Sequence, residues 1–320
     1  IIGRHNAVDE LTQDAMLCGN IAASLTGIND IERLITRISY GTANAKELRA
    51  LSAAIDRLPD VKANLENCRS ALLTEIRTGI DTLEDVSSLI NAAIVDEPPF
   101  TVREGGMVRD GFNAELDELR TIVNDGKGFL ANIQQREQDR TGIKKLKIGY
   151  NRVFGYYIEV SNSFKELVPE DYIRKQTLAN CERYITQELK ELEAKVLGAQ
   201  GRIVQLEYEI FSQVRNKTAD QLGRIQRTAN AVARLDVLRS FAASALENGY
   251  IRPEITDSST LKITDGRHPV VEKMLGGMPF VPNDTMLDCD DNRCAIITGP
   301  NMAGKSTYMR QIAIIVIMAQ

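Results

Sequence analysis

The sequence predicts a mainly α-helical protein with two exceptions: a small β-containing insert near its middle and the truncated start of an α/β phosphate-loop domain. Three observations lead to this fold class. Apolar residues recur at helical spacing in residues 1–126 and 187–252. Aromatic and β-branched residues alternate within residues 127–186. A glycine-rich phosphate-loop motif lies within residues 253–320.

Composition indicates an ordinary cytoplasmic protein. With 320 residues, 43% hydrophobic and 26% charged, the chain can form two or three folded domains, and global disorder is excluded. Its odd number of cysteines and the lack of a CxxC pair favour free thiols in a reducing compartment. No spacing fits a zinc site, even at the last two cysteines. The five are Cys18, Cys68, Cys181, Cys289 and Cys294.

Neither end of the chain resembles a natural terminus. The first residues are Ile-Ile rather than Met, and they do not resemble a signal peptide. The last residues lie within the helix expected after the phosphate loop. The longest apolar run, residues 312–319, is too short to cross a membrane. We therefore expect an internal piece of a larger cytoplasmic protein with no membrane association.

Residues 1–126 are expected to form several helices with short breaks. In "NAKELRALSAAIDRLP" the helical spacing runs to Leu58, and Pro59 is expected to stop that helix. In "GNIAASLTGINDIERLITRIS" the apolar residues at helical spacing are Leu25, Ile28, Ile31, Leu34, Ile35 and Ile38. These patterns indicate packing and carry no chemistry.

A heptad pattern follows Thr186. Its positions alternate by three and four residues, which predicts a long helix with a narrow apolar seam and one partner helix from before residue 140. Gly198 and Gly201 weaken this helix locally. The seam consists of Leu189, Leu192, Val196, Ala199, Ile203, Leu206, Ile210 and Gln213.

Residues 127–186 differ from the rest in composition. They hold eight of the seventeen Phe and Tyr residues, and eleven Lys and Arg against seven Asp and Glu give a charge of +4. The whole chain carries −5, so the remainder carries −9. In "LKIGYNRVFGYYIEVS" we expect strands, with Gly149 and Gly155 marking turns or bulges.

This contrast in charge favours a nucleic-acid surface, although a solvated lysine-rich loop explains the charge equally well. One basic group precedes the strands, and the other is expected where the chain turns back toward the long helix. The two groups are Lys144, Lys145, Lys147 and Arg152, and Arg174 and Lys175.

The motif "TGPNMAGKST" matches G-x-x-x-x-G-K-[ST]. Gly299 and Gly304 let backbone N–H groups approach phosphate oxygens, Lys305 neutralises phosphate charge, and the hydroxyl of Ser306 is a ligand for Mg²⁺. "RCAIIT" before the loop predicts a buried strand, and "KSTYMRQIAIIVIMA" after it predicts a helix. Strand, loop and helix in this order predict binding of ATP or ADP with Mg²⁺.

Hydrolysis needs more than this loop. An acidic residue on a second strand must hold Mg²⁺, and a further group must orient water. Asp288, Asp290 and Asp291 precede the loop and are expected to form a polar turn. We therefore assign no catalytic residue and expect no ATP turnover from residues 1–320 alone.

Several stretches together resemble the MutS family of DNA mismatch-recognition proteins. They are "TGPNMAGKSTYMRQIA", "GYNRVFGYYIEVSNS", "RKQTLANCERYIT", "GRHPVVE" with "PFVPND", "RHNAVDEL" and "GFNAELDELR". Their order covers essentially the whole chain.

The resemblance implies a division into domains and a function for the parent protein. Residues 1–126 and 187–252 would be core and lever helices, 127–186 a DNA clamp, and 253–320 the start of an ABC-type ATPase domain. The parent would be an ATP-regulated homodimer that recognises mismatched duplex DNA in the bacterial cytosol, near the nucleoid. It would act with a MutL-like repair factor.

The resemblance also implies roles for individual residues. Phe280 would stack on adenine, and Arg174, Lys175 and Asn180 would contact DNA phosphates. Ala303 and Ala179 depart from the family pattern, which often has glycine and lysine there. The full nucleotide set would be Gly299, Pro300, Asn301, Met302, Ala303, Gly304, Lys305, Ser306 and Thr307, with Phe280.

Two other interpretations stay open. In the first, the chain is a non-catalytic lever and DNA-clamp module with no turnover of its own. In the second, it belongs to a different coiled-coil ABC ATPase, such as a chromosome-organising protein. The second explains the heptads and the phosphate loop but leaves the aromatic insert unexplained.

Overall fold

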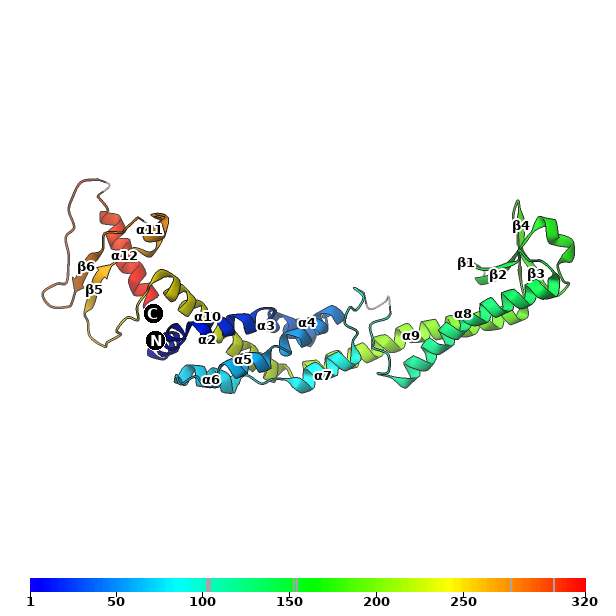
Figure 1. Cartoon of the computed structure of the whole chain (residues 1–320), viewed down its shortest axis with the longest axis horizontal. Helices are drawn as coiled ribbons and strands as arrows, with labels where there is room; N and C mark the ends of the chain where they lie inside the picture. Colours follow the sequence, from blue (N-terminus) through cyan, green and yellow to red (C-terminus); the bar gives the residue numbers. More distant parts are fainter. Residues whose placement is uncertain (102–104, 152, 154, 277, 302) are drawn as a thin grey trace. The chain divides into compact units, whose positions relative to one another are not determined.

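The computed structural model is mostly helical, with one four-stranded antiparallel sheet and one two-stranded sheet (Figure 1). It describes residues 1–101, 105–151, 153, 155–276, 278–301 and 303–320. The helices are α1 (Ile2–Gln13), α2 (Ala15–Leu25), α3 (Ile31–Ser39), α4 (Ala45–Ile55), α5 (Leu58–Asn64), α6 (Ala71–Gly79), α7 (Glu84–Ala93), α8 (Ala114–Thr141), η2 (Asn162–Leu167), α9 (Gln187–Ala219), α10 (Leu222–Asn248), α11 (Pro269–Met274) and α12 (Lys305–Met318). The strands are β1 (Lys147–Asn151), β2 (Gly155–Ser161), β3 (Ile173–Thr177), β4 (Cys181–Ile185), β5 (Leu261–Gly266) and β6 (Asn283–Leu287).

The chain divides into two compact units. One comprises residues 20–66 and 76–234, and the other comprises residues 1–19, 67–75 and 235–320. The first contains the helical core, the α8–α9 pair and the four-stranded sheet. The second contains the two-stranded sheet and the phosphate-loop motif. The predicted mainly helical class with a small β insert is therefore confirmed.

Short helices of the first unit pack against the carboxyl-terminal part of α9. α3 and α7 both contact α9, and α4 packs between them. Asn44 begins α4 with a capping box, in which its side chain accepts from the Glu47 N–H while the Glu47 carboxylate accepts from the Asn44 N–H. The apolar residues expected at helical spacing are buried in α3 and α4. On α9, Phe211 is the largest of the fully buried side chains in the described part of the chain.

α8 and α9 form a long antiparallel pair. Arg202 of α9 contacts Glu115 near the start of α8 at 2.9 Å, and Arg136 near the end of α8 pairs with Glu188 at the start of α9. The predicted seam is buried at five of its eight positions, and α9 continues without a break through both of its glycines. The five are Leu189, Val196, Ala199, Leu206 and Ile210.

Beyond Ile210 the buried stripe of α9 moves to different positions. Phe211, Val214 and Thr218 are buried there, whereas Gln213 is exposed. The helix contacts α3 and α7 in this region, so it follows their surface. An α-helix has 3.6 residues per turn, so a strict heptad stripe drifts around it unless the partner helix supercoils with it.

The sheet that joins α8 to α9 has the strand order β1-β2-β4-β3, and every neighbouring pair is antiparallel. The register shifts between Arg174 and Gln176, where β3 bulges against β4. Gly155 opens β2 with a φ of 80°, a conformation that favours glycine. Gly149 lies inside β1 opposite Tyr157, and a Cβ there would lie 2.7 Å from the tyrosine ring.

The second unit is built around the β5–β6 hairpin. The carboxylate of Glu10 in α1 accepts hydrogen bonds from the backbone N–H groups of Arg69 and Ser70, at 2.6 and 2.7 Å. α12 contacts β5, and the Tyr308 hydroxyl lies 2.8 Å from Thr285 Oγ1 of β6. The apolar helix after the phosphate loop therefore packs against a neighbour.

Three sequence expectations need correction. Pro59 does not end helical structure, because α4 already ends at Ile55 and Pro59 lies in the first turn of α5, where its missing N–H has no partner to lose. Gly149 marks a close approach between strands and no turn. Residues 293–298, expected as a buried strand, are irregular and exposed. A strand of this kind needs neighbours for its backbone groups, and β5 and β6 pair with each other.

Two of the three domain boundaries expected from the sequence fall at or between helices and strands of the structure, and one falls inside a helix. The boundary at residue 186 coincides with the N-cap of α9, where Thr186 accepts from the Leu189 N–H. The boundary at 252 falls between α10 and β5. The boundary at 126 falls inside α8.

The close approach of α8 and α9 predicts a strong effect of one methyl group. In Gly126→Ala the new Cβ would lie 2.5 Å from Val196 Cγ2, and a valine in a helix has little rotamer freedom to yield. We expect the free energy of unfolding to fall by about 1 to 3 kcal/mol in urea denaturation.

Gly128→Ala is the matched control, because Gly128 is in the same helix with nothing within 4 Å of its ideal Cβ. This change should stabilise the protein by about 0.5 to 1 kcal/mol through helix propensity. Equal effects of the two substitutions would show that helix packing does not constrain residue 126.

Candidate functional site

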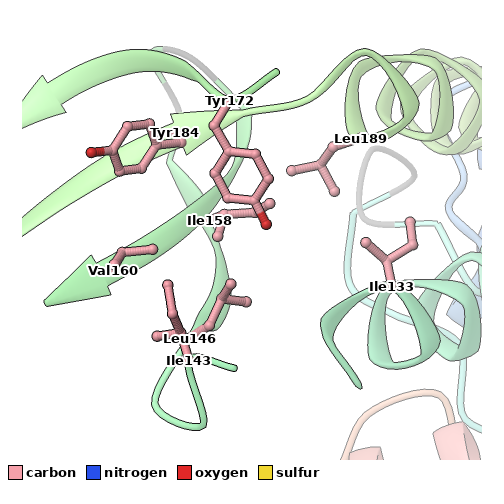
Figure 2. Packing of buried hydrophobic residues seen from close by; sticks show 8 residues of the cluster. All are labelled: Ile133, Ile143, Leu146, Ile158, Val160, Tyr172, Tyr184 and Leu189. Atoms are coloured by element: carbon pink, nitrogen blue, oxygen red, sulfur yellow. The ribbon is translucent and has the colours of Figure 1, made fainter. Parts of the chain in front are cut away.

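One face of the four-stranded sheet packs onto the end of the α8–α9 pair (Figure 2). Ile133 of α8 and Leu189 of α9 belong to the same apolar cluster as the sheet residues. Both helices thus share a core with the sheet. The remaining fully packed members are Ile143, Leu146, Ile158, Val160, Tyr172 and Tyr184.

Two buried carboxylates border this cluster, each held by a tyrosine. The Tyr172 hydroxyl donates to Glu137 Oε2 at 2.8 Å, and Arg140 pairs with the same oxygen at 2.8 Å. The Tyr184 hydroxyl donates to Glu182 Oε2. Glu137 is 6% exposed and Glu182 is 3% exposed, so these hydrogen bonds and ion pairs replace contacts with water that burial removes from the two carboxylates.

The pKa values of these groups follow from their surroundings. Burial and the neighbouring Glu182 carboxylate raise the pKa of Tyr184 to about 12. Burial and Glu137 raise the pKa of Tyr172 as well. Hydrogen bonds from Tyr184 and Lys165 hold the pKa of Glu182 below its ordinary value. At neutral pH the tyrosines are therefore donors and the carboxylate is an acceptor.

The predicted DNA-contacting residues lie in two groups at opposite edges of the sheet. Lys144 and Lys145 are exposed in the turn between α8 and β1, and Lys147 is exposed at the start of β1. Arg174 and Lys175 are exposed on β3, the other edge strand. We had expected Arg174 and Lys175 where the chain turns back toward the long helix. This expectation is wrong, because strand β4 lies between β3 and α9 in the chain. Arg152 lies outside the described residues.

Asn180 is exposed in the tight connection between β3 and β4. Its carbonyl accepts from the Asn162 N–H at 3.2 Å, and the Asn162 side chain donates to the Ala179 carbonyl at 2.9 Å. The backbone of this connection is therefore fixed by η2.

The sequence analysis missed two further cations, Lys165 beside the sheet and Arg183 within it. Lys165 of η2 contacts Glu182 Oε1 at 3.0 Å, and Arg174 contacts the same oxygen at 3.5 Å. Arg183 of β4 pairs with Glu159 at 3.0 Å and lies 4.3 Å from the centre of the Tyr157 ring. Arg183 and Glu159 are cross-strand partners of β4 and β2, so their ion pair could be predicted only from the strand register. No pattern in the sequence indicates the contact between Lys165 and Glu182.

The phosphate-loop residues begin α12. Gly304 is its N-cap, with a φ of 84°, and Gly299 has a φ of 150°. The first backbone hydrogen bond of the helix runs from the Tyr308 N–H to the Gly304 carbonyl at 2.9 Å. The N–H groups of Lys305, Ser306 and Thr307 precede it and have no acceptor within the helix, so they can bind an anion, as at other helix starts.

Lys305 bends back over its own loop. Its Nζ donates to the carbonyl of Gly299 and, at 3.2 Å, to the carbonyl of Pro300. These are the contacts that a phosphate would replace, since a lysine ammonium prefers an anion to a neutral carbonyl. These N–H groups and the cation lie at one helix end, which is an arrangement that suits an anion.

The other predicted nucleotide residues lie on both sides of this helix start. Asn301 and Ala303 are exposed in the loop, Ser306 is exposed in the first turn of α12, and Phe280 is half-buried before β6. Met302 lies outside the described residues. Asp288 forms the expected polar turn, because its carboxylate accepts from the Asp290 and Asn292 N–H groups, both at 2.9 Å.

No helix in the described part of the chain is long and apolar enough to cross a membrane.

Residues 111–202 match the MutS family domain IV, and residues 295–320 match the MutS domain V. Over 317 residues, 99% of this chain, it is 52% identical to the DNA mismatch repair protein MutS of Acetivibrio thermocellus and 52% identical to that of Alkaliphilus oremlandii. It is 53% identical to the protein of the same name from Caldicellulosiruptor saccharolyticus over 317 residues. The chain spans about a third of the length of these curated relatives, 36 to 37% of each.

The buried carboxylate at residue 182 predicts an acid-sensitive sheet. Its pKa is lowered on folding from an ordinary value of 4.5, so its ionised form stabilises the fold above that value. This stabilisation should be lost as the pH falls through the lower folded value. Glu182→Gln should lose stability at neutral pH, and the difference from the unmodified chain should shrink below about pH 4.5.

Tyrosine fluorescence can follow this transition locally, because the chain has no tryptophan and five of its nine tyrosines lie in residues 150–184. A stability difference that stays constant from pH 7 to pH 3 would contradict the assignment to Glu182.

Proposed function

The chain belongs to the MutS family, and from this we propose that it is part of an ATP-regulated sensor of mismatched duplex DNA. Residues 127–186 would be the clamp that contacts the DNA backbone. Residues 1–126 and 187–252 would be the core and lever, and residues 253–320 would begin the ATPase domain. The match of residues 111–202 to domain IV supports the clamp assignment most directly.

Exposed cations at both edges of the clamp sheet support binding of the phosphate backbone. Lys144, Lys145 and Lys175 are exposed, and none of them has a carboxylate partner among the described ion pairs. Phosphate contacts fix a protein on duplex DNA without reading its sequence. Recognition of the mismatch itself would then belong to other parts of the parent protein.

The helix start at Gly304 supports binding of a nucleoside triphosphate. The free N–H groups and Lys305 would hold the phosphates, Ser306 would supply a ligand to Mg²⁺, and Phe280 would stack on the base. Bound Mg²⁺ would neutralise phosphate charge. This chain's own contribution is to orient the phosphates at the helix start.

A clamp module without ATP turnover is the second candidate for the 320-residue polypeptide. Residues 306–320 contain no acidic residue, and residues 293–298 form no strand. Hydrolysis needs an acidic residue on a strand beside the loop. Homodimerisation, a MutL-like partner and a cytoplasmic location are carried over from the family as parts of the proposal.

The clamp proposal predicts a salt-dependent affinity for duplex DNA. In Lys144→Ala/Lys145→Ala/Lys175→Ala the slope of log affinity against log salt should become shallower by about 0.9 for each phosphate contact removed. Fluorescence anisotropy with a labelled duplex between about 50 and 200 mM salt measures this slope.

A triple variant with the same change in charge is the control. Lys217, Lys262 and Lys273 are exposed outside residues 127–186, and their replacement by Ala should leave the slope unchanged. Similar slopes in both triple variants would remove the support for a clamp surface.

The loop proposal predicts nucleotide binding that depends on one lysine. Lys305→Ala should weaken ATP·Mg²⁺ binding at least about tenfold, because a charge-assisted contact to phosphate contributes roughly 1.5 to 3 kcal/mol. Titration calorimetry on the 320-residue chain measures this affinity. Lys262→Ala should leave it unchanged. Robust hydrolysis by the chain, abolished by Lys305→Ala, would refute the module without turnover.

A further inference from the structure

The carboxylate of Glu182 holds two cations at the edge of the clamp sheet. Lys165 Nζ and Arg174 Nη1 contact the same oxygen, Glu182 Oε1, at 3.0 and 3.5 Å. The other oxygen, Oε2, accepts from the Tyr184 hydroxyl. We call Lys165 and Arg174 the Glu182 pair. Both positive charges are therefore placed by one buried negative charge.

The geometry of the Glu182 pair suits a phosphodiester. Because both nitrogens contact one oxygen at 3.0 and 3.5 Å, they lie no more than 6.5 Å apart. One phosphodiester group carries its charge on two non-bridging oxygens, which two cations at this separation can contact together. Such charge-assisted hydrogen bonds are stronger than hydrogen bonds between neutral groups.

Exposure separates the two sides of this cluster. The side chains of Lys165 and Arg174 are each 57% exposed, whereas the Glu182 side chain is 4% exposed. The cations are thus accessible to solvent, and each carries more N–H donors than its contact with Glu182 uses, since an ammonium has three donors and a guanidinium five. Arg174 also lies on β3, which is an edge strand of the sheet formed by the described strands.

We propose that Lys165 and Arg174 form a phosphodiester-binding pair, and that Glu182 sets its affinity by competing for the same donors. The proposal rests on the proposed function, because duplex DNA is its ligand. Glu182 thereby limits how tightly the clamp grips any one phosphate. Loss of its charge would strengthen binding at this edge irrespective of DNA sequence.

The competition follows from the positions of the charges. A phosphate that contacts both cations must approach the Glu182 carboxylate, and two negative charges at such a separation repel each other across a partly buried site. The carboxylate cannot turn away freely, because Tyr184 holds its second oxygen and the Tyr184 ring is itself packed at a tilt against the Tyr172 ring, with the ring centres 5.8 Å apart. The repulsion is therefore built into the folded sheet.

Glu182→Gln tests the proposal on the 320-residue chain. Glutamine keeps an acceptor for Tyr184 and removes the charge. We expect about three- to tenfold tighter binding of a labelled duplex near 0.1 M salt, and a salt slope steeper by up to about 0.9, because Lys165 already contributes a contact in the unmodified chain. Adding Lys165→Ala and Arg174→Ala to this variant should return the slope to that of the unmodified chain or below.

Glu159→Gln is the matched control, because it removes the same charge from the same sheet. Glu159 pairs with Arg183 and makes no contact with the Glu182 pair among the described ion pairs. An equal gain in affinity in both variants would assign the effect to net charge and overturn the proposal. Unchanged affinity and slope in Glu182→Gln would overturn it as well.

A second variant covers the case in which Glu182→Gln does not fold, as judged by circular dichroism. Lys165→Ala in the unmodified chain should make the salt slope shallower by about 0.9, and an unchanged slope would overturn the proposal.

Heparin separates failure of this inference from failure of the proposed function. If neither the unmodified chain nor Glu182→Gln binds the duplex, DNA binding by the isolated chain is refuted. Heparin, a polyanion with sulfate and carboxylate groups, then tests whether the Glu182 pair binds anions at all. Later elution of Glu182→Gln than of Glu159→Gln supports the pair. Coincident elution overturns it.

Discussion

The antiparallel packing of α8 against α9 is the constraint on which the four-stranded sheet depends. The sheet is inserted between these helices, so its first and last strands must begin and end where the helix pair ends. Gly126 allows the helices to approach closely beside Val196, and ion pairs at both ends fix their register. Ile133 and Leu189 then continue the helix interface into the sheet core. The sheet is therefore held at the end of the helix pair by this packing.

Charge in residues 127–186 is divided between the interior and the surface. Glu137 and Glu182 are buried beside tyrosines. Glu137 pairs with Arg140 of its own helix, and Glu182 pairs with Lys165 and Arg174 from neighbouring elements. Part of the basic character seen in the composition therefore balances internal carboxylates. The remaining lysines at the two sheet edges face solvent. The basic segment is thus two edge groups on either side of a nearly neutral sheet, which suits contacts to separate phosphates.

The phosphate loop shows how a local motif depends on its neighbours. α12 forms as expected, since it is held by Tyr308 against β6 and begins at a glycine with positive φ. Gln311 on the same helix is fully buried, and neither of its polar side-chain atoms has a hydrogen-bond partner among the described residues. The preceding segment stays irregular. A helix satisfies its own backbone, whereas a strand needs another strand beside it.

The sequence alone determined the helical class, the heptad seam, the aromatic insert, the phosphate loop and the family, because each is a local pattern or a run of adjacent residues. Residues such as Leu189 and Val196 could be placed on one helix face from spacing alone. Tertiary structure decided which charges meet. Lys165, Arg174 and Glu182 come from three elements, and only the strand order and the bulge in β3 bring them together. The same holds for residues 293–298, whose apolar pattern suits a strand but whose pairing depends on partners that spacing cannot supply.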